Sequence, residues 1–357
     1  MASVFLTGFP GFLGSELVAR LLDRTALPIR CLVQDRYRDL AESRAAELAD
    51  PDRVELHTGD ITEDDLGLGN DYDDLRADAV EVYHLAAVYD LGVPRDVGMA
   101  VNVEGTRNVL DFADGIGDLR GFHYVSTCYV SGRHDGTFTH RDLDVGQSFN
   151  NHYEETKFLA EVEVQDRMDD GLPATIYRPA ITVGDSKTGA TQKYDGPYHV
   201  LGLLARQPRV AILPVFGDPG AYEVNVVPRN FVVDAIDHLS AREDACGEVY
   251  QLCDPNPPTV AEMVRAFGDA LDKRVLAVPS SLGVSRFALE SSPRLERALG
   301  VEPAALDYFV HPTSYTCENA ARGLHGSEVR CPPFRSYVDE LVEFYRSHPE
   351  ISSDAMA

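Results

Sequence analysis

Tyr153 and Lys157 have residue types and a spacing that suit proton transfer. They are four positions apart in a stretch with helical periodicity, so their side chains are expected on one helix face, one turn apart. A free tyrosine has a pKa of about 10, but a neighbouring ammonium favours the phenolate and lowers that pKa. Such a pair can shuttle a proton. The spacing is common in helices, and its significance here comes from the preceding strand, which ends in Ser126 and Thr127.

Three glycines, Gly8, Gly11 and Gly14, stand between a strand-like run and a helix-like run. Glycine lets the backbone approach a pyrophosphate, and the N-terminus of the next helix offers free N–H groups and a positive dipole. The context of strand, turn and helix separates this pattern from an ordinary tight turn, although GxxGxxG differs from the GxGxxG fingerprint. We predict that this loop binds the pyrophosphate of a dinucleotide.

Strand-like and helix-like segments alternate around these motifs. The predicted strands are residues 3–7, 29–33, 53–61, 80–88, 122–130 and 175–184, and the predicted helices are 15–24, 36–48, 102–113 and 153–168. A helix at 198–205, a return strand at 222–227 and a helix from 230 follow. This alternation predicts an α/β fold with a doubly wound parallel Rossmann sheet, whose ligands bind beyond the carboxyl ends of the strands. A smaller C-terminal lobe of mixed α/β structure should carry the substrate.

The length of 357 residues exceeds what one ordinary core supports. We predict a dinucleotide-binding domain at residues 1–185, with a return segment near 222–250. The substrate lobe should take residues 186–221 and 251–345. Residues 346–357 should form a tail, frayed from Ser352 onward. The acidic runs 63–66 and 71–74 are expected to be solvated loops.

The composition excludes several classes of partner. The formal charge is −26, with 58 acidic and 32 basic residues, which repels nucleic-acid phosphates and anionic lipid surfaces. Such an acid excess with four lysines resembles the halophilic surfaces of salt-adapted proteins. The six cysteines show no CxxC pairing, no export signal is evident, and no apolar run approaches 18 residues, so we expect reduced thiols in a cytoplasmic protein.

Seven ordered phrases of the chain carry a family resemblance. They are TGFPGFLG at 7–14, GDIT at 59–62, YHLAAVYD at 83–90, NVEGT at 102–106, YVSTCYVSG at 124–132, YEETK at 153–157 and YRPAITVGDSKTG at 177–189. Together they closely resemble the extended short-chain dehydrogenase/reductases, which bind NAD(P). Within that superfamily, HLAAVYDL, VSTCYVSG and YRPAITVGDSKTG look like the branch of thioester reductases and fatty-acyl-CoA reductases. The resemblance spans nearly the whole chain.

The resemblance implies a role for each matching position. Thr127 would hydrogen-bond the substrate carbonyl, Tyr153 would deliver the proton, and Lys157 would bind ribose hydroxyls and depress the tyrosine pKa. Asn102 would have a supporting role or would cap a helix. Cofactor contacts are implied for Gly8, Phe9, Pro10, Gly11, Phe12, Leu13, Gly14, Asp60, Ile61, Ala86, Ala87, Tyr153, Lys157 and Pro179.

The end of the second strand bears on the choice between NADP and NAD. Asp35 is the kind of acid that binds the ribose 2′-hydroxyl of NAD, whereas arginines accommodate the 2′-phosphate of NADP. Relatives that use NADP often have an arginine where this chain has Gln34, but Arg36, Arg38 and Arg44 could compensate. We therefore predict NADP, with NAD as the alternative, and place Arg36 in the cofactor site.

A local reversal of charge suggests where the substrate binds. Residues 186–214 contain four cations against one acid, Asp195, in an otherwise acidic chain, directly after the predicted sixth strand. The segment is rich in Gly, Pro and Thr and suits a movable lid, although its cations could simply soften repulsion. We predict that the phosphates of CoA or phosphopantetheine are bound here, and that the substrate-binding residues are Tyr89, Lys187, Lys193, Arg206 and Arg209.

The leading hypothesis is reduction of an acyl thioester to an aldehyde by hydride transfer, with Tyr153 as proton donor. A sugar-nucleotide epimerase or dehydratase, or a hydroxysteroid-type dehydrogenase, would use the same three residues on another substrate. A non-catalytic dinucleotide sensor is less consistent with the retained Tyr/Lys pair. His84 is expected to be structural and Cys128 a packed thiol. No histidine spacing indicates a metal site, and a homodimer remains open.

Overall fold

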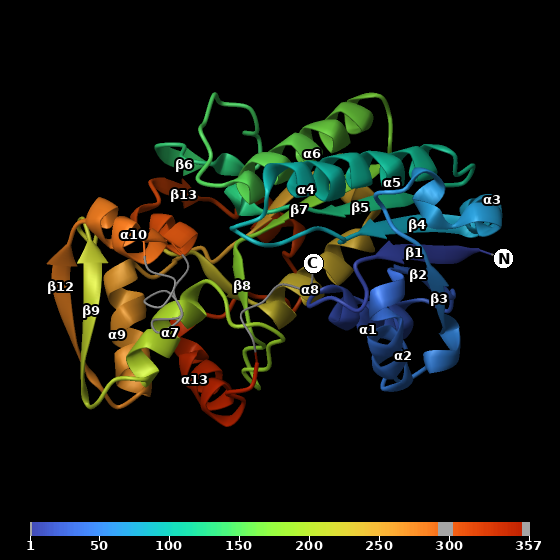
Figure 1. Cartoon of the computed structure of the whole chain (residues 1–357). Coiled ribbons are helices and arrows are strands. Elements are labelled where there is room, and N and C mark those ends of the chain that lie inside the picture. Colours follow the sequence, from blue (N-terminus) through green and yellow to red (C-terminus); the bar gives the residue numbers. More distant parts are fainter. Residues whose placement is uncertain (1, 292–302, 352–357) are drawn as a thin grey trace.

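The computed structural model describes residues 2–291 and 303–351 and is built on a seven-stranded sheet (Figure 1). All of the pairings within this sheet are parallel, and its order is that of a doubly wound Rossmann sheet. The direction of winding reverses between β1 and β4, so a crevice opens beyond their carboxyl ends. The strand order is β11 (Val249–Leu252), β7 (Ala174–Pro179), β5 (Gly121–Val125), β4 (Ala79–His84), β1 (Ser3–Thr7), β2 (Ile29–Val33) and β3 (Val54–Thr58).

Helices cover both faces of this sheet because each face is apolar (Figure 1). One face packs against α1 (Gly14–Arg24), α2 (Arg38–Ala46) and α8 (Arg229–Ser240). The other face packs against α3 (Tyr72–Asp78), α5 (Gly105–Asp114) and α6 (His152–Asp169). The short helix α4 (Arg95–Gly98) lies beside α6.

A second apolar core lies beyond the sheet, at the left of Figure 1. It joins α7 (Pro197–Ala205), α9 (Val260–Ala270) and α13 (Val338–Ser347) to the strand β9 (Val210–Phe216). Two small parallel pairs complete this region, along with the helix α10 (Leu282–Glu290). The first pair is β9 with β12 (Arg274–Ser280), and the second is β8 (Ile181–Val183) with β10 (Val226–Pro228).

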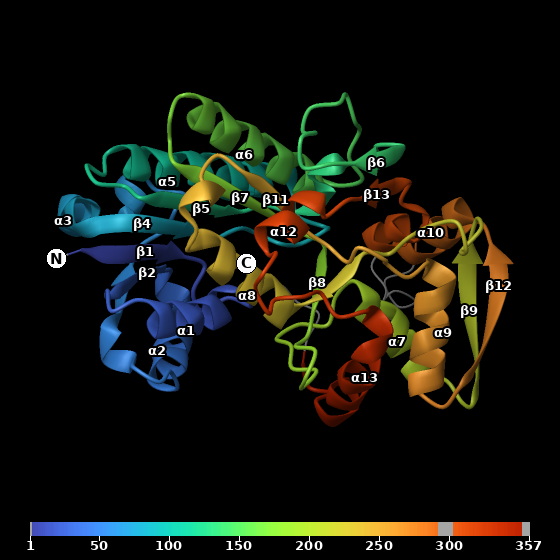
Figure 2. The ribbon, with the colours of Figure 1, turned by 180° about the vertical axis from the view of Figure 1, so that it is seen from behind.

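Part of the predicted substrate lobe packs elsewhere. The strand β13 (Thr313–Tyr315) pairs with β6 (Gly136–Phe138), and α12 (Glu318–Gly323) lies against β11 at the edge of the large sheet (Figure 2). None of the helices in the described residues is long and apolar enough to cross a membrane.

Most predicted elements are present, but several boundaries differ. The predicted strand 175–184 is broken at Ala180 into β7 and β8, and the predicted strand 122–130 stops at Val125, after which residues 128–131 form a 3₁₀ turn. Residues 71–74 lead into α3 and are not the loop that their charge suggested. The strand β11 was not predicted. Residues 352–357, expected to fray, lie outside the described residues.

Candidate active site

The glycine loop sits at the carboxyl end of β1 and is shaped by close backbone contacts. Gly8 has a positive φ of 96°, and a Cβ atom there would come within 2.8 Å of the Leu85 carbonyl carbon. A Cβ atom on Gly14 would collide with the Gly8 carbonyl oxygen. No side chain caps the first turn of α1, where the Ser15 N–H donates to the Gly11 carbonyl oxygen at 3.0 Å, so the positive end of the helix dipole lies at this loop. These features fit the pyrophosphate of a dinucleotide.

A cavity of about 530 Å³ extends from this loop over the ends of β4, β5 and β7. It brings together all of the predicted catalytic and cofactor residues, although the chain supplies them from segments more than 100 positions apart. The predicted residues that line it are Gly8, Phe9, Pro10, Gly11, Phe12, Leu13, Gly14, Arg36, Asp60, Ile61, Ala86, Ala87, Tyr89, Thr127, Tyr153, Lys157, Pro179 and Lys193.

Tyr153 and Lys157 reach the cavity because α6 begins just before them. Asn151 caps the helix and accepts a 3.0 Å hydrogen bond from the backbone N–H of Glu154. Tyr153 and Lys157 then fall one turn apart on the buried face. Burial raises the pKa of Tyr153, and a hydrogen bond with the Thr127 side chain acts in the opposite direction. The phenol is therefore protonated near neutral pH and can act as an acid.

The Lys157 ammonium is buried and held by two acceptors. Its Nζ atom donates a 2.7 Å hydrogen bond to the Tyr124 hydroxyl and a 2.9 Å hydrogen bond to the Val125 carbonyl oxygen. Burial lowers the pKa of Lys157 to about 7, and the Glu161 carboxylate opposes that shift. The side chain can thus change its charge in the physiological range.

A buried polar network centred on His84 lies next to the catalytic residues. His84 lies between the Thr7 hydroxyl, 2.7 Å from Nδ1, and the Thr106 hydroxyl, 3.0 Å from Nε2. Thr106 donates its own proton to the Asn102 carbonyl oxygen, so His84 carries its hydrogen on Nε2. Burial lowers the pKa of His84 to about 3 and keeps the ring neutral. The expectation of a structural histidine agrees with these contacts.

Asn102 braces the loop after β4 and does not cap a helix. Its side chain accepts a 2.9 Å hydrogen bond from the Val88 backbone N–H and donates a 3.0 Å hydrogen bond to Thr156 on α6. The residue lies inside a π-helical turn, Met99–Glu104, which leads into α5. Of the two predicted roles, the structure agrees with the supporting one.

The end of β2 presents Gln34 and Arg36 to the cavity, whereas Asp35 is not among its lining residues. Gln34 donates a 2.6 Å hydrogen bond to Asp60 and accepts from Arg36 Nη2 at 2.7 Å. Arg38 turns away and donates to Glu42 and to the Leu56 carbonyl oxygen.

Arg44 contacts the glycine loop but is not one of the residues that line the cavity. It donates to the Pro10 carbonyl oxygen and, at 3.1 Å, to the Gln192 side chain. Of the three arginines expected to compensate for Gln34, only Arg36 lines the cavity.

The other end of the cavity is aromatic. Tyr89 packs edge-on against Tyr153, with 4.9 Å between ring centres, and Lys193 Nζ lies 5.0 Å from the centre of the Tyr89 ring. Lys193 also forms an ion pair of 3.3 Å with Asp195, which lines the cavity too. Tyr308 joins this wall from a C-terminal 3₁₀ segment, and its hydroxyl donates a 2.7 Å hydrogen bond to Glu154.

Three predicted substrate residues, Lys187, Arg206 and Arg209, do not line the cavity. Lys187 lies in the turn after β8, while Arg206 and Arg209 lie between the end of α7 and the start of β9. The contributions of Asp195 and Tyr308 were not predicted from the sequence. The local charge pattern contained Asp195 as the one acid among cations, but nothing local pointed to Tyr308.

Cys128 is fully buried and donates a 3.1 Å hydrogen bond from its thiol to the Arg178 carbonyl oxygen. It is a packed thiol as expected, although it lies in the 3₁₀ turn after β5 and not in a strand. Among the described residues, no group of three or more His, Cys, Asp or Glu side chains could hold a metal ion.

Comparison with known proteins identifies the family. The model of an NAD-binding family described as "Male sterility protein" matches residues 6–236. The terminal R domain of the myxalamid PKS-NRPS biosynthetic pathway, a solved structure, superposes with a TM-score of 0.83 and 24% identity. That superposition covers 98% of this chain and 92% of the R domain.

Relatives differ in how much of their length this chain spans. The non-canonical nonribosomal peptide synthetase FrzA of a Cladobotryum species is 29% identical over 72% of the chain, which spans 26% of that protein. Aldehyde reductase lnbA of Aspergillus flavus is 26% identical over 95% of the chain, which spans 34% of it. Low-salt glycan biosynthesis protein Agl12 of Haloferax volcanii is 29% identical over 86% of the chain. The match covers 98% of the length of Agl12.

The glycine loop, the assembled Thr127, Tyr153 and Lys157, and the family match agree with one another. The chain belongs to the NAD-binding family described as male sterility protein and has the fold of the solved R domain.

Proposed function

We propose that this enzyme reduces an acyl thioester, carried on CoA or on a phosphopantetheine arm, to the aldehyde. The observation that carries the proposal is that Thr127, Tyr153 and Lys157 line one cavity together with the glycine loop. The similarity to nonribosomal peptide synthetases and their reductase domains supports a thioester as the substrate.

A bound nicotinamide dinucleotide would supply the hydride that reduces the carbonyl carbon. The loop Gly8–Gly14 would hold its pyrophosphate, Asp60 and Ile61 would flank the adenine, and Pro179 would lie on the nicotinamide side. The cavity is continuous along all of these residues.

Thr127 and Tyr153 would act on the substrate oxygen. Both hydroxyl groups lie at the carboxyl end of β5, where they can donate to the carbonyl oxygen as negative charge develops on it. Tyr153 then transfers its proton to that oxygen, which gives a neutral hemithioacetal once the carbon has gained a hydride. Breaking the C–S bond releases the aldehyde and a thiol, and the hydroxyl proton of the hemithioacetal ends on the thiol sulfur.

Lys157 would make the proton transfer reversible. Its ammonium lies one turn from Tyr153 and favours the phenolate that remains after protonation of the substrate. The same ammonium can donate to ribose hydroxyl groups.

NADPH is the cofactor that the geometry supports over NADH. The Arg36 guanidinium faces the cavity while the Asp35 carboxylate does not line it, so a 2′-phosphate would meet a cation and not an acid. Gln34 holds Arg36 in place through the hydrogen bonds described above.

The phosphate-bearing arm of the substrate would enter past Lys193. This cation lies at the aromatic end of the cavity, next to Tyr89, and Tyr89 contacts Tyr153. Lys187, Arg206 and Arg209 would act only on phosphates that extend outside the cavity.

A second candidate is a reaction on a sugar nucleotide. The similarity to Agl12 extends over nearly the whole of that protein, so an activity on a glycan precursor is compatible with the same three catalytic residues. That substrate would also bring phosphates to Lys193.

One assay separates the candidates. The purified protein, in high salt, is given NADPH or NADH with matched acyl-CoAs, the corresponding aldehydes, or nucleotide sugars. Absorbance at the nicotinamide band is followed, and the sugar products are analysed separately because epimerisation and dehydration consume no net cofactor. Oxidation of NADPH with acyl-CoA, accompanied by release of free CoA thiol, supports the proposal. Turnover with nucleotide sugars alone would replace it with the second candidate.

A further inference from the structure

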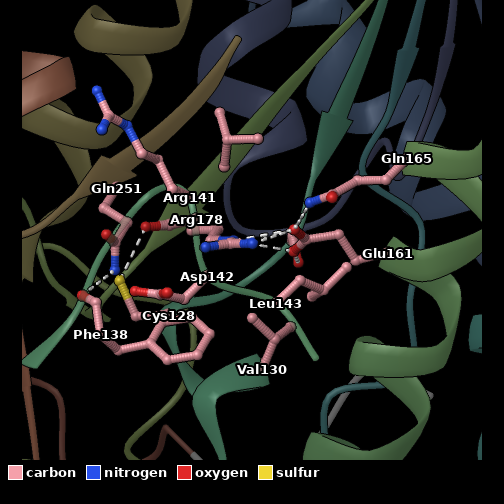
Figure 3. Close-up of polar contacts among 12 residues, drawn as sticks. Cys128, Val130, Phe138, Arg141, Asp142, Leu143, Glu161, Gln165, Arg178 and Gln251 are labelled. Carbon is pink, nitrogen blue, oxygen red and sulfur yellow. Dashed lines mark hydrogen bonds and ion pairs between the residues drawn. The ribbon is translucent and has the colours of Figure 1, made fainter. Parts of the chain in front are cut away.

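A fully buried ion pair lies behind the catalytic residues. Glu161 on α6 and Arg178 on β7 have no exposed side-chain surface, and the nearest oxygen and nitrogen atoms are 2.6 Å apart. Arg178 also donates from Nε to Glu161 Oε1 at 2.9 Å and to Oε2 at 3.2 Å, so two nitrogens of the guanidinium bond this carboxylate. Figure 3 shows the two side chains facing one another end to end, with Gln165 directed at the same carboxylate.

The Glu161 carboxylate joins three elements. It accepts hydrogen bonds from Arg178 on β7 and from Gln165, one turn further along α6. It also accepts a 2.5 Å hydrogen bond from the Ser126 hydroxyl, in the segment that follows β5. These three elements carry Pro179, Tyr153 with Lys157, and Thr127, respectively.

The contacts follow the order of the chain. Tyr153, Lys157 and Glu161 are spaced four apart on one buried face of α6. Three successive residues at and after the end of β5 meet that face. Val125, the last residue of β5, accepts from Lys157, Ser126 donates to Glu161, and Thr127 lines the cavity together with Tyr153. Glu161 is thus one of the points that fix the reacting segment to α6.

Stability alone does not account for this pair. Removing two charges from water is costly, and apolar side chains of similar volume commonly stabilise a core as well as a buried ion pair does. The ion pair adds a fixed relative orientation of the two side chains, because a guanidinium that bonds one carboxylate through two of its nitrogen atoms is held in one geometry.

We infer that Glu161 and Arg178 are a positioning pair that fixes Thr127 and Pro179 relative to Tyr153 and Lys157. Neither residue lines the cavity, so they act through Ser126 and the backbone of β7. The Ser126 N–H donates to the Tyr177 carbonyl oxygen at 2.7 Å. This hydrogen bond joins the segment that follows β5 to β7 next to Arg178. The inference rests on the proposed function only in assigning Thr127 and Tyr153 to one reacting oxygen.

The charged surroundings of Lys157 agree with this role. His84 on β4 is neutral, Tyr124 on β5 is a neutral acceptor, and Glu161 is the acid one turn beyond Lys157 on α6. Glu161 therefore also favours the ammonium form of Lys157.

The test replaces both charges with apolar side chains of similar length, as Glu161→Met with Arg178→Met in the full chain. If the pair positions the site, kcat falls by about 10²-fold while the melting temperature, the KM and the Kd for NADPH stay within a few-fold or a few degrees of the wild type. Full retention of kcat in the folded double variant overturns the inference. The matched control is Arg107→Met with Glu163→Met, which removes a partly exposed ion pair between α5 and α6 and should leave kcat unchanged.

Ser126→Ala keeps both charges paired and removes only the link between Glu161 and the segment of Thr127. We expect it to lower kcat about 10-fold with KM unchanged, and this variant decides the question if the double variant does not fold. A wild-type kcat in Ser126→Ala would then overturn the inference. All variants are measured with whichever carbonyl substrate the wild type turns over, so failure of the thioester proposal appears in the wild type and failure of the positioning pair only in the variants.

Discussion

The Lys157 ammonium lies over the Tyr124 ring, 4.3 Å from its centre, and donates a hydrogen bond to the hydroxyl of the same residue. A buried ammonium usually needs a carboxylate, but here the first partners are a phenol and a carbonyl oxygen. Burial lowers the pKa of Lys157 to about 7, well below the 10.5 of a free lysine.

This relationship predicts a pH dependence. Because the folded-state pKa is lowered, the ammonium is present below about pH 7 and is lost as the pH rises through that value. We expect kcat/KM for the cofactor to fall about tenfold per pH unit on the alkaline side, since this parameter reports the free enzyme. Initial rates from about pH 5 to about pH 9 measure it.

Tyr124→Phe should move that midpoint to lower pH. The change removes an acceptor from the ammonium, a loss on the order of 1 kcal/mol, which corresponds to roughly 0.7 of a pKa unit. If the midpoint of the alkaline fall in kcat/KM is the same in this variant as in the wild type, a group other than Lys157 causes that fall.

Tyr153→Phe should abolish turnover while leaving cofactor binding nearly unchanged. The substitution removes the proton donor but none of the contacts to the pyrophosphate, and general acid catalysis is worth about 10²- to 10⁴-fold. Steady-state kinetics together with titration of NADPH fluorescence separates the two effects. Activity within a few-fold of the wild type would remove Tyr153 from the mechanism. Lys157→Ala, in comparison, should damage both turnover and cofactor binding.

Arg36→Ala should lower kcat/KM for NADPH by about 10- to 100-fold and leave NADH almost unaffected. A hydrogen bond to a charged group contributes about 1.5–3 kcal/mol, and only NADPH has the 2′-phosphate. Gln34→Arg should act in the opposite direction by adding a cation beside the same position.

The matched control for the coenzyme prediction is Arg38→Ala, because Arg38 donates to Glu42 and to a backbone oxygen and does not line the cavity. It should leave the ratio of NADPH to NADH activity as it is. An unaltered ratio in Arg36→Ala would mean that Arg36 does not bind the phosphate.

Lys193→Met should raise KM for acyl-CoA about 10-fold by removing the cation at the aromatic end of the cavity. A short aldehyde without phosphate should keep its kcat, because Tyr153 and Thr127 are untouched. The comparison of the two substrates is the measurement, repeated at two salt concentrations to test for loss of a charge interaction.

Arg206→Ala with Arg209→Ala tests the outer cations separately. If they bind the distal phosphates of CoA, the double variant raises KM for acyl-CoA and makes it less sensitive to salt. Equal loss of activity on acyl-CoA and aldehyde would instead show that the two arginines support the fold.

The six thiols should differ in reactivity in the folded protein. Cys246 is exposed, whereas Cys31, Cys128 and Cys253 are buried, and burial raises the pKa of the Cys31 thiol. The thiolate is the reactive form, so a disulfide reagent should modify Cys246 first and the buried three only on unfolding. Cys246→Ser should remove the fast phase of the reaction. A fast phase that persists in this variant would contradict the assigned burial.

Contiguous motifs were predictable from the sequence because their geometry is local. The glycine loop from Gly8 to Gly14 contains its own turn and the start of its own helix, and the spacing of Tyr153 and Lys157 places both on one face of α6 whatever surrounds them. The alternation of apolar strands and amphipathic helices likewise predicted the parallel sheet.

Tertiary structure decided the rest. Arg36, Arg38 and Arg44 are equivalent in the sequence, yet only Arg36 lines the cavity, because the others find acceptors in Leu56 and Pro10. Tyr308 enters the site from more than 150 positions beyond Tyr153, and Arg178 meets Glu161 across two elements. Charge and residue type are properties of the chain, but the direction in which a long side chain points depends on which partners the packed elements bring within hydrogen-bonding distance.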